Sequence, residues 1–188
     1  VARILRAHRI PFTALDISPD QIAMVRRYGA EAYFGDAARL DILQAAKTAN
    51  ATAFVLAIDD VEASLKVAAI IRAHFPELPI YARARNRQHV YRLMDLGIQS
   101  IRRETFMSSV ELTRELLTGL GHSSERTQKT IDRFVAHDRQ MLYDGYKYAS
   151  DTDKLQTRAR DAARELEALL AQDEADIEAD ASVKSPKT

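Results

Sequence analysis

The stretch Ala32-Tyr33-Phe34-Gly35-Asp36-Ala37 is an apolar run that stops on a glycine and an acid. Two other apolar runs end in acids in the same way, over residues 12–16 and 54–60. Apolar residues at helical spacing follow each of the three runs. Strands that end in acids and lead into helices indicate a parallel sheet with a row of carboxylates along one rim. We expect function at that rim, because open α/β sheets bind ligands outside the carboxyl ends of their strands.

Strands and helices alternate through residues 1–103. We expect strands over 12–17, 30–34, 53–58, 80–84 and 98–101, with helices between them. This alternation predicts right-handed βαβ units and an α/β fold, a Rossmann-like doubly wound parallel sheet. In the common strand order the first strand is central and a glycine-rich loop follows it. The chain shows neither and starts in mid-helix without a Met, so we expect an N-terminally truncated fragment whose first strand and loop precede Val1.

The alternation stops at Glu104 and helical patterns replace it. We expect three domains or segments: a partial nucleotide-binding domain over 1–103, a helical segment over 104–150, and an amphipathic helix with a disordered acidic tail over 151–188. Gly119-Leu120-Gly121 follows a helix rather than a strand. It therefore predicts a helix terminator and not a phosphate-binding loop.

The composition excludes several classes of function. Lys plus Arg and Asp plus Glu both number 27, so a net charge of zero gives no electrostatic argument for binding nucleic acid. Without cysteine the chain has no disulfide, zinc-thiolate site or thiol nucleophile. No apolar run approaches the roughly 20 residues that span a bilayer. The histidines lack ligand spacing, so we expect no metal site; they are His8, His74, His89, His122 and His137.

Two acids are the main candidates for binding a nucleotide. Asp16, with Ile17 after it, ends what would be the second strand of the complete sheet, where an acid accepts hydrogen bonds from ribose hydroxyls. An acid there repels a 2′-phosphate, which favours NAD or AMP over NADP. Asp36 is placed to contact the adenine or its ribose, and Ala37 is small enough to let a base approach. The alternative is that Asp16 is a loop or capping acid and that Asp36 caps the following helix.

A second group of charged residues follows the next two strands. Asp59 and Asp60 end one strand near the expected phosphate position, and one of them is a natural helix cap. Arg83 and Arg85 come at and after the end of the next strand, where they would face phosphates, a partner subunit or solvent. No serine elbow, Walker loop or paired catalytic carboxylate is present in the sequence. We therefore expect a binding protein and not an enzyme.

Seven short motifs occur in one order along the chain. They are Leu15-Asp16 with Pro19-Asp20, Tyr28-Gly29, Tyr33-Phe34-Gly35-Asp36-Ala37, Ala57-Ile58-Asp59-Asp60, His74-Phe75-Pro76, Ala82-Arg83-Ala84-Arg85 and Arg103-Glu104-Thr105-Phe106. Together they resemble the cytoplasmic regulatory domain (RCK or KTN, TrkA-N-like) of Kef-type glutathione-regulated potassium efflux systems. These are bacterial potassium/proton antiporters of the monovalent cation:proton antiporter-2 family. The similarity runs through the whole chain.

The resemblance implies a regulatory role in potassium transport. A domain of this type binds a nucleotide such as NAD or AMP without catalysis and forms a homodimer, to which residues 104–150 would contribute. Its own transmembrane antiporter part would lie upstream, with this domain on the cytoplasmic side of a bacterial inner membrane. In the glutathione-gated members, glutathione holds the channel closed and its bulky adducts open it. A flavin quinone oxidoreductase serves as ancillary subunit.

The resemblance also implies residues for a glutathione site. Arg3 matches an arginine of the first helix, and Arg103 matches the arginine just before Glu-Thr-Phe. Tyr28 stands where the family usually has the phenylalanine that bulky adducts move. Asp138 falls at about the position of the site's asparagine. This last match is a departure, because a carboxylate repels an anionic tripeptide unless it is protonated or paired.

Two other functions remain open from the sequence. A freestanding regulatory subunit of a potassium-uptake system would have the same fold. An NAD-dependent oxidoreductase would need a substrate domain with a positioned acid or base, and the residues after Glu104 show none. The sequence upstream distinguishes these readings, since a series of apolar spans would favour the antiporter.

Overall fold

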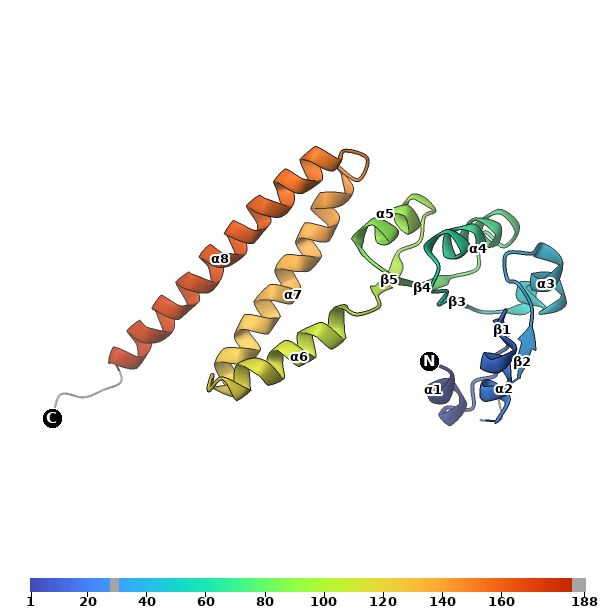
Figure 1. Ribbon diagram of the computed structural model, residues 1–188, viewed down its shortest axis with the longest axis horizontal. Coiled ribbons are helices and arrows are strands. Elements are labelled where there is room, and N and C mark those ends of the chain that lie inside the picture. The colour runs from blue at the N-terminus through green and yellow to red at the C-terminus, as the bar shows by residue number, and fades with distance from the viewer. Residues whose placement is uncertain (28–30, 184–188) are drawn as a thin grey trace. The chain divides into compact units, whose positions relative to one another are not determined.

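The structure is a computed structural model that describes residues 1–27 and 31–183. The chain divides into two compact units, Val1–Arg103 and Glu104–Thr188, which are described separately below. Unit 1 contains, in order, α1 (Ala2–Ala7), β1 (Ala14–Asp16), α2 (Pro19–Arg27), β2 (Ala32–Phe34), α3 (Leu40–Ala45), a 3₁₀ turn η1 (Thr48–Asn50), β3 (Phe54–Leu56), α4 (Val61–His74), β4 (Ile80–Ala84), α5 (Arg87–Asp95) and β5 (Ser100–Arg103) (Figure 1).

All strand pairings in unit 1 are parallel, as the alternation of strands and helices predicts. One sheet pairs β1 with β2, with Ala14 opposite Ala32 and Asp16 opposite Phe34. The second sheet has the order β3-β4-β5. In a doubly wound sheet of the common order, these are the two outer groups of strands, and the first strand would lie between β1 and β3. That a first strand precedes Val1 stays a prediction.

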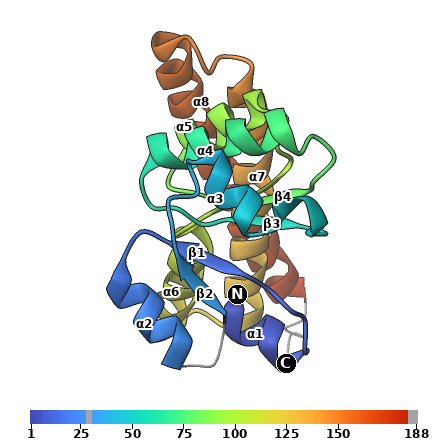
Figure 2. The same cartoon turned by 90° about the vertical axis from the view of Figure 1, so that its right-hand side faces the viewer.

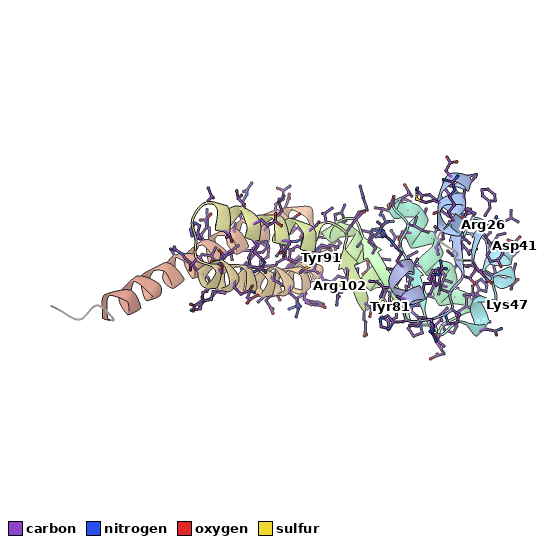
Figure 3. The ribbon with its side chains drawn as sticks, turned by 90° about the horizontal axis from the view of Figure 1, so that it is seen from below. Arg26, Asp41, Lys47, Tyr81, Tyr91 and Arg102 are labelled. Carbon is purple, nitrogen blue, oxygen red and sulfur yellow. The ribbon has the colours of Figure 1, made fainter. Side chains whose placement is uncertain are left out.

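Helices α4 and α5 cover one face of the three-stranded sheet, and both views show them on the same side of it (Figures 1 and 2). The strand residues that face them are buried; they are Leu56, Ile80, Ala82 and Ala84. On the opposite face, Val55 of β3 lies beside Tyr81 of β4, and Tyr81 is 53% exposed. Figure 3 views the chain from below and labels Tyr81. The buried side of the three-stranded sheet is therefore the one that faces α4 and α5, while Val55 and Tyr81 on its other face are exposed.

The strand β5 begins two residues later than the sequence predicts, at Ser100 rather than Ile98. The reason is how α5 ends. Gly97 has a φ of 71°, its N–H donates to the carbonyl of Met94, and the N–H of Ile98 donates to the carbonyl of Leu93. These two bonds form a Schellman motif, in which the residue after the glycine packs back on the helix. Ile98 is 1% exposed. It is thus part of the helix end and not the first residue of the strand.

The described part of unit 2, residues 104–183, forms three helices: α6 (Phe106–Gly119), α7 (Ser124–Tyr146) and α8 (Thr152–Val183). Helix α6 ends as its glycines predict, because Gly121 has a φ of 95° and the N–H of His122 donates to the carbonyl of Leu117. Ser123 caps α7 by accepting a hydrogen bond from the N–H of Arg126 at 3.3 Å. Helix α7 packs against both α6 and α8.

The acidic run of the expected tail is helical in the residues that the structure describes. Helix α8 continues through the acidic run 173–180 as far as Val183. Alanines and glutamates alternate with the aspartates of this run, and the strong helix propensity of Ala and Glu offsets the repulsion between its acids. Residues 184–188 of the expected tail lie outside the described residues.

Candidate functional site: a rim of carboxylates

The structure brings Asp16 and Asp36 to the same edge of the two-stranded sheet. The N–H of Gly35 donates to the backbone carbonyl of Asp16 at 3.0 Å, which joins the carboxyl ends of β1 and β2. Oδ1 of Asp16 accepts a hydrogen bond from the N–H of Ser18, and Oδ1 of Asp36 accepts one from the N–H of Ala38, both at 2.8 Å. One oxygen of each carboxylate is thereby fixed by its own loop. The two acids are held as neighbours at the rim.

The alternative role of Asp36 as the cap of α3 is wrong. The N-cap position of α3 is Arg39, whose side chain donates to Asp41 and caps nothing. Asp36 closes the preceding turn instead. Its neighbour Ala37 is partly exposed, and Ile17, next to Asp16, is 68% exposed. The rim therefore combines two oriented carboxylates with an exposed apolar side chain, a combination that suits the polar ribose and the flat base of a nucleoside.

Gly35 allows this rim to form because α3 approaches it closely. A Cβ built on Gly35 would lie 2.7 Å from Cγ2 of Ile42 in α3. Atoms at that distance overlap, and the β-branched Ile42 has few rotamers with which to move away. The glycine that precedes Asp36 is therefore required by packing. At the opposite end of β2, Nε of Arg26 donates a hydrogen bond to the carbonyl of Ala32 at 2.8 Å. This bond connects α2 to the first residue of the strand; Figure 3 labels Arg26.

The second group of charged residues forms its own contacts. Arg83 of β4 forms an ion pair with Asp59 and donates to the carbonyl of Ala57 at 2.8 Å. Arg83 thus connects β4 to the residues that follow β3, and the negative charge of Asp59 compensates its positive charge. Oδ1 of Asp60 accepts from the N–H of Ala63 at 2.8 Å, so the capping role expected of one of these two acids is confirmed for Asp60. A phosphate role for Asp59 and Arg83 stays a prediction.

The residues of the expected glutathione site are distributed over both units. Arg3 lies on α1 and is exposed, and Arg103 ends β5, both in unit 1. Asp138 lies on α7 in unit 2 and is 5% exposed. Tyr28 lies outside the described residues. The burial of Asp138 is notable because a buried carboxylate needs a partner, and Asp138 has an interaction within the chain.

Sequence reasoning missed His89, which is fully buried at the start of α5. Its Nδ1 accepts the N–H of Arg85 at 3.2 Å, and among the described residues its Nε2 has no hydrogen-bond partner. The N–H of His89 donates to Oδ1 of Asn86, the cap of α5. Burial lowers the pKa of His89, nearby Arg92 lowers it further, and Glu62 opposes both. Asn86 followed by a polar residue three positions later is a capping pattern that could have revealed this group.

We expect the buried imidazole to make unfolding pH-dependent. The folded pKa of His89 lies below the value near 6.5 of an unfolded chain, so as the pH falls through about 6.5 the unfolded state takes up the proton before the folded state does. Stability is thus lost as the pH falls, by at most about 1.4 kcal/mol per pH unit. Urea unfolding from pH 7.5 to 5.5 measures this slope. His89→Gln should remove this pH dependence of the free energy of unfolding, whereas His74→Gln, at an exposed position, should retain it. If the unmodified protein and both variants show equal slopes, His89 is not the group responsible.

Metal ligands and membrane spans are both absent from the described part of the chain. Over those residues no group of His, Asp and Glu side chains is arranged to hold a metal ion. No helix among them is long and apolar enough to cross a membrane.

Comparison with known proteins decides the family. The TrkA-N domain family matches residues 1–103, and the family "Potassium efflux system KefB C-terminal domain" matches residues 108–184. The solved Kef C-terminal domain of Shewanella denitrificans in its AMP-bound form is 39% identical, with a TM-score of 0.70 over 77% of this chain and 89% of that one. The chain belongs to the Kef-type regulatory domains.

The Kef-type domain also resembles a more distant relative. The TrkA-N domain of the inner membrane protein ybaL from Escherichia coli is 26% identical, with a TM-score of 0.53 over 63% of this chain and 84% of that one. The Rossmann-like α/β fold followed by helices is confirmed by these neighbours. Both matched families are regulatory parts of potassium transport proteins, so this chain is a regulatory domain of a potassium efflux system.

Proposed function

We propose that this Kef-type domain senses an adenine nucleotide, NAD or AMP, at the rim that carries Asp16 and Asp36. The observation that carries the proposal is the hydrogen bond from the N–H of Gly35 to the backbone carbonyl of Asp16, which joins the ends of the two strands that carry these acids. The AMP-bound form of the Shewanella domain supports a nucleotide ligand. The carboxylates accept hydrogen bonds from ribose hydroxyls, and Ile17 and Ala37 border the base. The nucleotide is bound and not transformed.

The proposed output is gating of potassium/proton antiport by ligand-dependent repacking of a homodimer. A ligand biases such a gate only through different affinities for its two states. Support for a dimer comes from leucines four residues apart that form an exposed apolar stripe; they are Leu112 and Leu116 of α6 and Leu120 at its C-cap. A stripe of this kind is a surface that a second copy can cover. The domain would act on the cytoplasmic side of a bacterial inner membrane, on its own upstream transmembrane antiporter part, with a flavin quinone oxidoreductase as ancillary partner.

The finer regulatory ligand in this proposal is glutathione or its adducts. Arg3 and Arg103 would supply positive charge to the carboxylates of the tripeptide. Tyr28 would respond to the bulk of an adduct. Asp138 would take the place of an amide; it is 5% exposed and already has an interaction within the chain.

The test titrates glutathione and AMP separately into the intact protein by calorimetry. We expect the variant Arg3→Ala/Arg103→Ala to bind glutathione at least about tenfold more weakly, because each arginine–carboxylate contact contributes about 1.5–3 kcal/mol. AMP affinity stays within about twofold, because neither arginine lies at the rim of β1 and β2. The exposed arginine Arg102 serves for comparison, and Arg102→Ala should bind both ligands as the unmodified protein does.

The outcomes of these titrations separate the parts of the proposal. Unchanged glutathione affinity in the double variant would remove glutathione gating and leave the nucleotide site. Failure of the intact protein to bind either AMP or NAD would overturn the nucleotide sensor itself. The match of residues 108–184 to a potassium efflux family favours an efflux regulator over a potassium-uptake subunit or an NAD-dependent oxidoreductase.

A further inference from the structure

Phe34 is the last residue of β2 and stands directly before Gly35 and Asp36. Its side chain is 66% exposed. A single exposed apolar side chain is ordinary on a protein surface, so the argument depends on where this one lies. Phe34 places an uncovered aromatic ring at the edge where open α/β sheets bind their ligands.

The register of the two-stranded sheet sets Phe34 beside Asp16. The two residues are partners in the parallel pairing of β1 with β2. Neighbouring strands lie about 4.8 Å apart, and directly paired residues project from the same face of the sheet. The aromatic ring and the carboxylate therefore belong to one face. A ligand group that bonds to Asp16 has the ring of Phe34 one strand away.

This face of β2 is covered at the start of the strand and open at its end. Alternation along the strand puts Ala32 and Phe34 on one face and Tyr33 on the opposite one. Ala32 is 2% exposed, and α2 packs against β2 (Figure 2). The cover does not extend to Phe34, which stays largely exposed. Tyr33, whose partner in β1 is Leu15, is thus a second exposed aromatic residue at an adjacent position on the other face.

The end of the neighbouring strand adds both apolar and polar groups near Phe34. Ile17 follows Asp16 directly and is exposed. The N–H of Gly35 donates to the carbonyl of Asp16, so the residues that end the two strands are held next to each other. Asp16 and Asp36 each use one carboxylate oxygen to accept a backbone N–H. The surroundings of the ring therefore combine apolar surface with oriented acceptor oxygens.

An aromatic ring beside oriented carboxylates suits a nucleoside better than a purely apolar partner. An apolar protein surface or a lipid chain on Phe34 would remove the acids from water without giving them hydrogen bonds, which is costly. A purine presents a flat π-face that stacks on an aromatic side chain. The ribose attached to that purine presents hydroxyl donors to the acid. One nucleoside can therefore satisfy both kinds of group at once.

We propose that the ring of Phe34 is the stacking platform for the base of the nucleotide. This inference rests on the proposed nucleotide sensor and assigns the contact with the face of the base, while Asp16 keeps the ribose. Stacking needs a planar ring, so an aromatic residue can replace Phe34 and an aliphatic residue cannot. Every base has a π-face, so the platform holds a base without selecting adenine, and selectivity comes from other groups at the rim.

The first test measures the AMP affinity of the intact protein by calorimetry. We expect Phe34→Ala and Phe34→Leu to bind AMP about tenfold more weakly, because both lose the stacked ring. Phe34→Tyr keeps the ring and should bind AMP within about twofold of the unmodified protein. Tyr33→Ala is the matched control, because it removes an exposed aromatic residue from the adjacent position and the opposite face. Its AMP affinity should not change.

The second test places an indole at the same position. The chain has no tryptophan, so the fluorescence that it gains in Phe34→Trp comes from position 34. A base stacked on an indole quenches its emission. We expect AMP to quench Phe34→Trp in a saturable manner and to leave Tyr33→Trp unchanged. Ribose 5-phosphate, which has the sugar and the phosphate but no base, should quench neither variant.

The outcomes distinguish this inference from the proposed function. If the unmodified protein binds neither AMP nor NAD, the nucleotide sensor fails and the stacking role fails with it. If the protein binds AMP, but Phe34→Ala and Phe34→Leu bind it as tightly as Tyr33→Ala does, only the stacking role is overturned. Weaker binding by Phe34→Ala without quenching of Phe34→Trp would also overturn it, because the ring would then support the fold of the rim rather than the base.

Discussion

Replacing Asp16 by alanine is expected to weaken AMP binding by about 10- to 100-fold. The reason is the position of its carboxylate, which ends β1 at the rim and is oriented by the hydrogen bond from the N–H of Ser18 at 2.8 Å. A carboxylate held in advance accepts hydrogen bonds from ribose hydroxyls without losing further freedom. Hydrogen bonds to a charged group contribute about 1.5–3 kcal/mol, and 1.4 kcal/mol is a factor of ten in affinity.

The comparison variants distinguish the negative charge of Asp16 from its role as a hydrogen-bond acceptor for Ser18. Asp16→Asn keeps an oxygen for Ser18 and should lose less affinity than Asp16→Ala. Asp41→Ala removes an exposed acid of α3 that pairs with Arg39 and that ends no strand, and it should bind AMP normally. Calorimetric titration of the three variants measures the affinities. If Asp16→Ala binds AMP as tightly as Asp41→Ala does, Asp16 is only a turn-forming acid.

Gly35→Ala is expected to destabilise unit 1 by about 1–3 kcal/mol, the usual cost of overpacking. The added methyl group would lie 2.7 Å from Cγ2 of Ile42, so either α3 or the end of β2 must shift. Urea unfolding gives the free energy. Gly119→Ala is the matched control, because it adds the same methyl group in α6 with no atom within 4 Å. Alanine inside a helix is favoured over glycine, so the control should be neutral or stabilising.

A double variant tests the cause of the Gly35 effect. Ile42→Ala removes the atom that the new methyl group would meet, so Gly35→Ala should cost much less in its presence. The coupling between the two changes should then be of the same order as the cost of Gly35→Ala itself. Additive costs, or a Gly35→Ala protein no less stable than Gly119→Ala, would show that α3 adjusts freely.

The sequence contained most of the fold because local signals and apolar periodicity agree. Strand β4 begins and ends at the predicted residues, Ile80 and Ala84, where prolines and buried alternation mark its limits. Both helix-ending glycines, Gly97 and Gly121, adopt the positive φ that this role requires. The start of β5 is harder to predict, because an isoleucine after a helix-ending glycine looks the same in sequence whether it packs on the helix or begins a strand.

The candidate site was predictable only in part. The rim of Asp16 and Asp36 follows from the rule that parallel strands end on one edge, which a sequence reveals. The ion pair of Arg83 with Asp59 depends on the register of β3 and β4, which periodicity does not give. The burial of His89 and Asp138 is a tertiary property of two polar residues that pattern reasoning assigns to the surface. For the same reason, the contacts of His137 with Glu165 and of Arg158 with Asp144 between α7 and α8 required the structure.

The close contact of Gly35 with Ile42 also has an evolutionary consequence. The residue before Asp36 cannot grow without moving α3, so drift at this end of β2 is limited by packing whatever the ligand. The end of β1 carries no comparable restriction, because Ile17 beside Asp16 is largely exposed. Substitutions that alter the rim should therefore be tolerated more easily at the end of β1 than at Gly35.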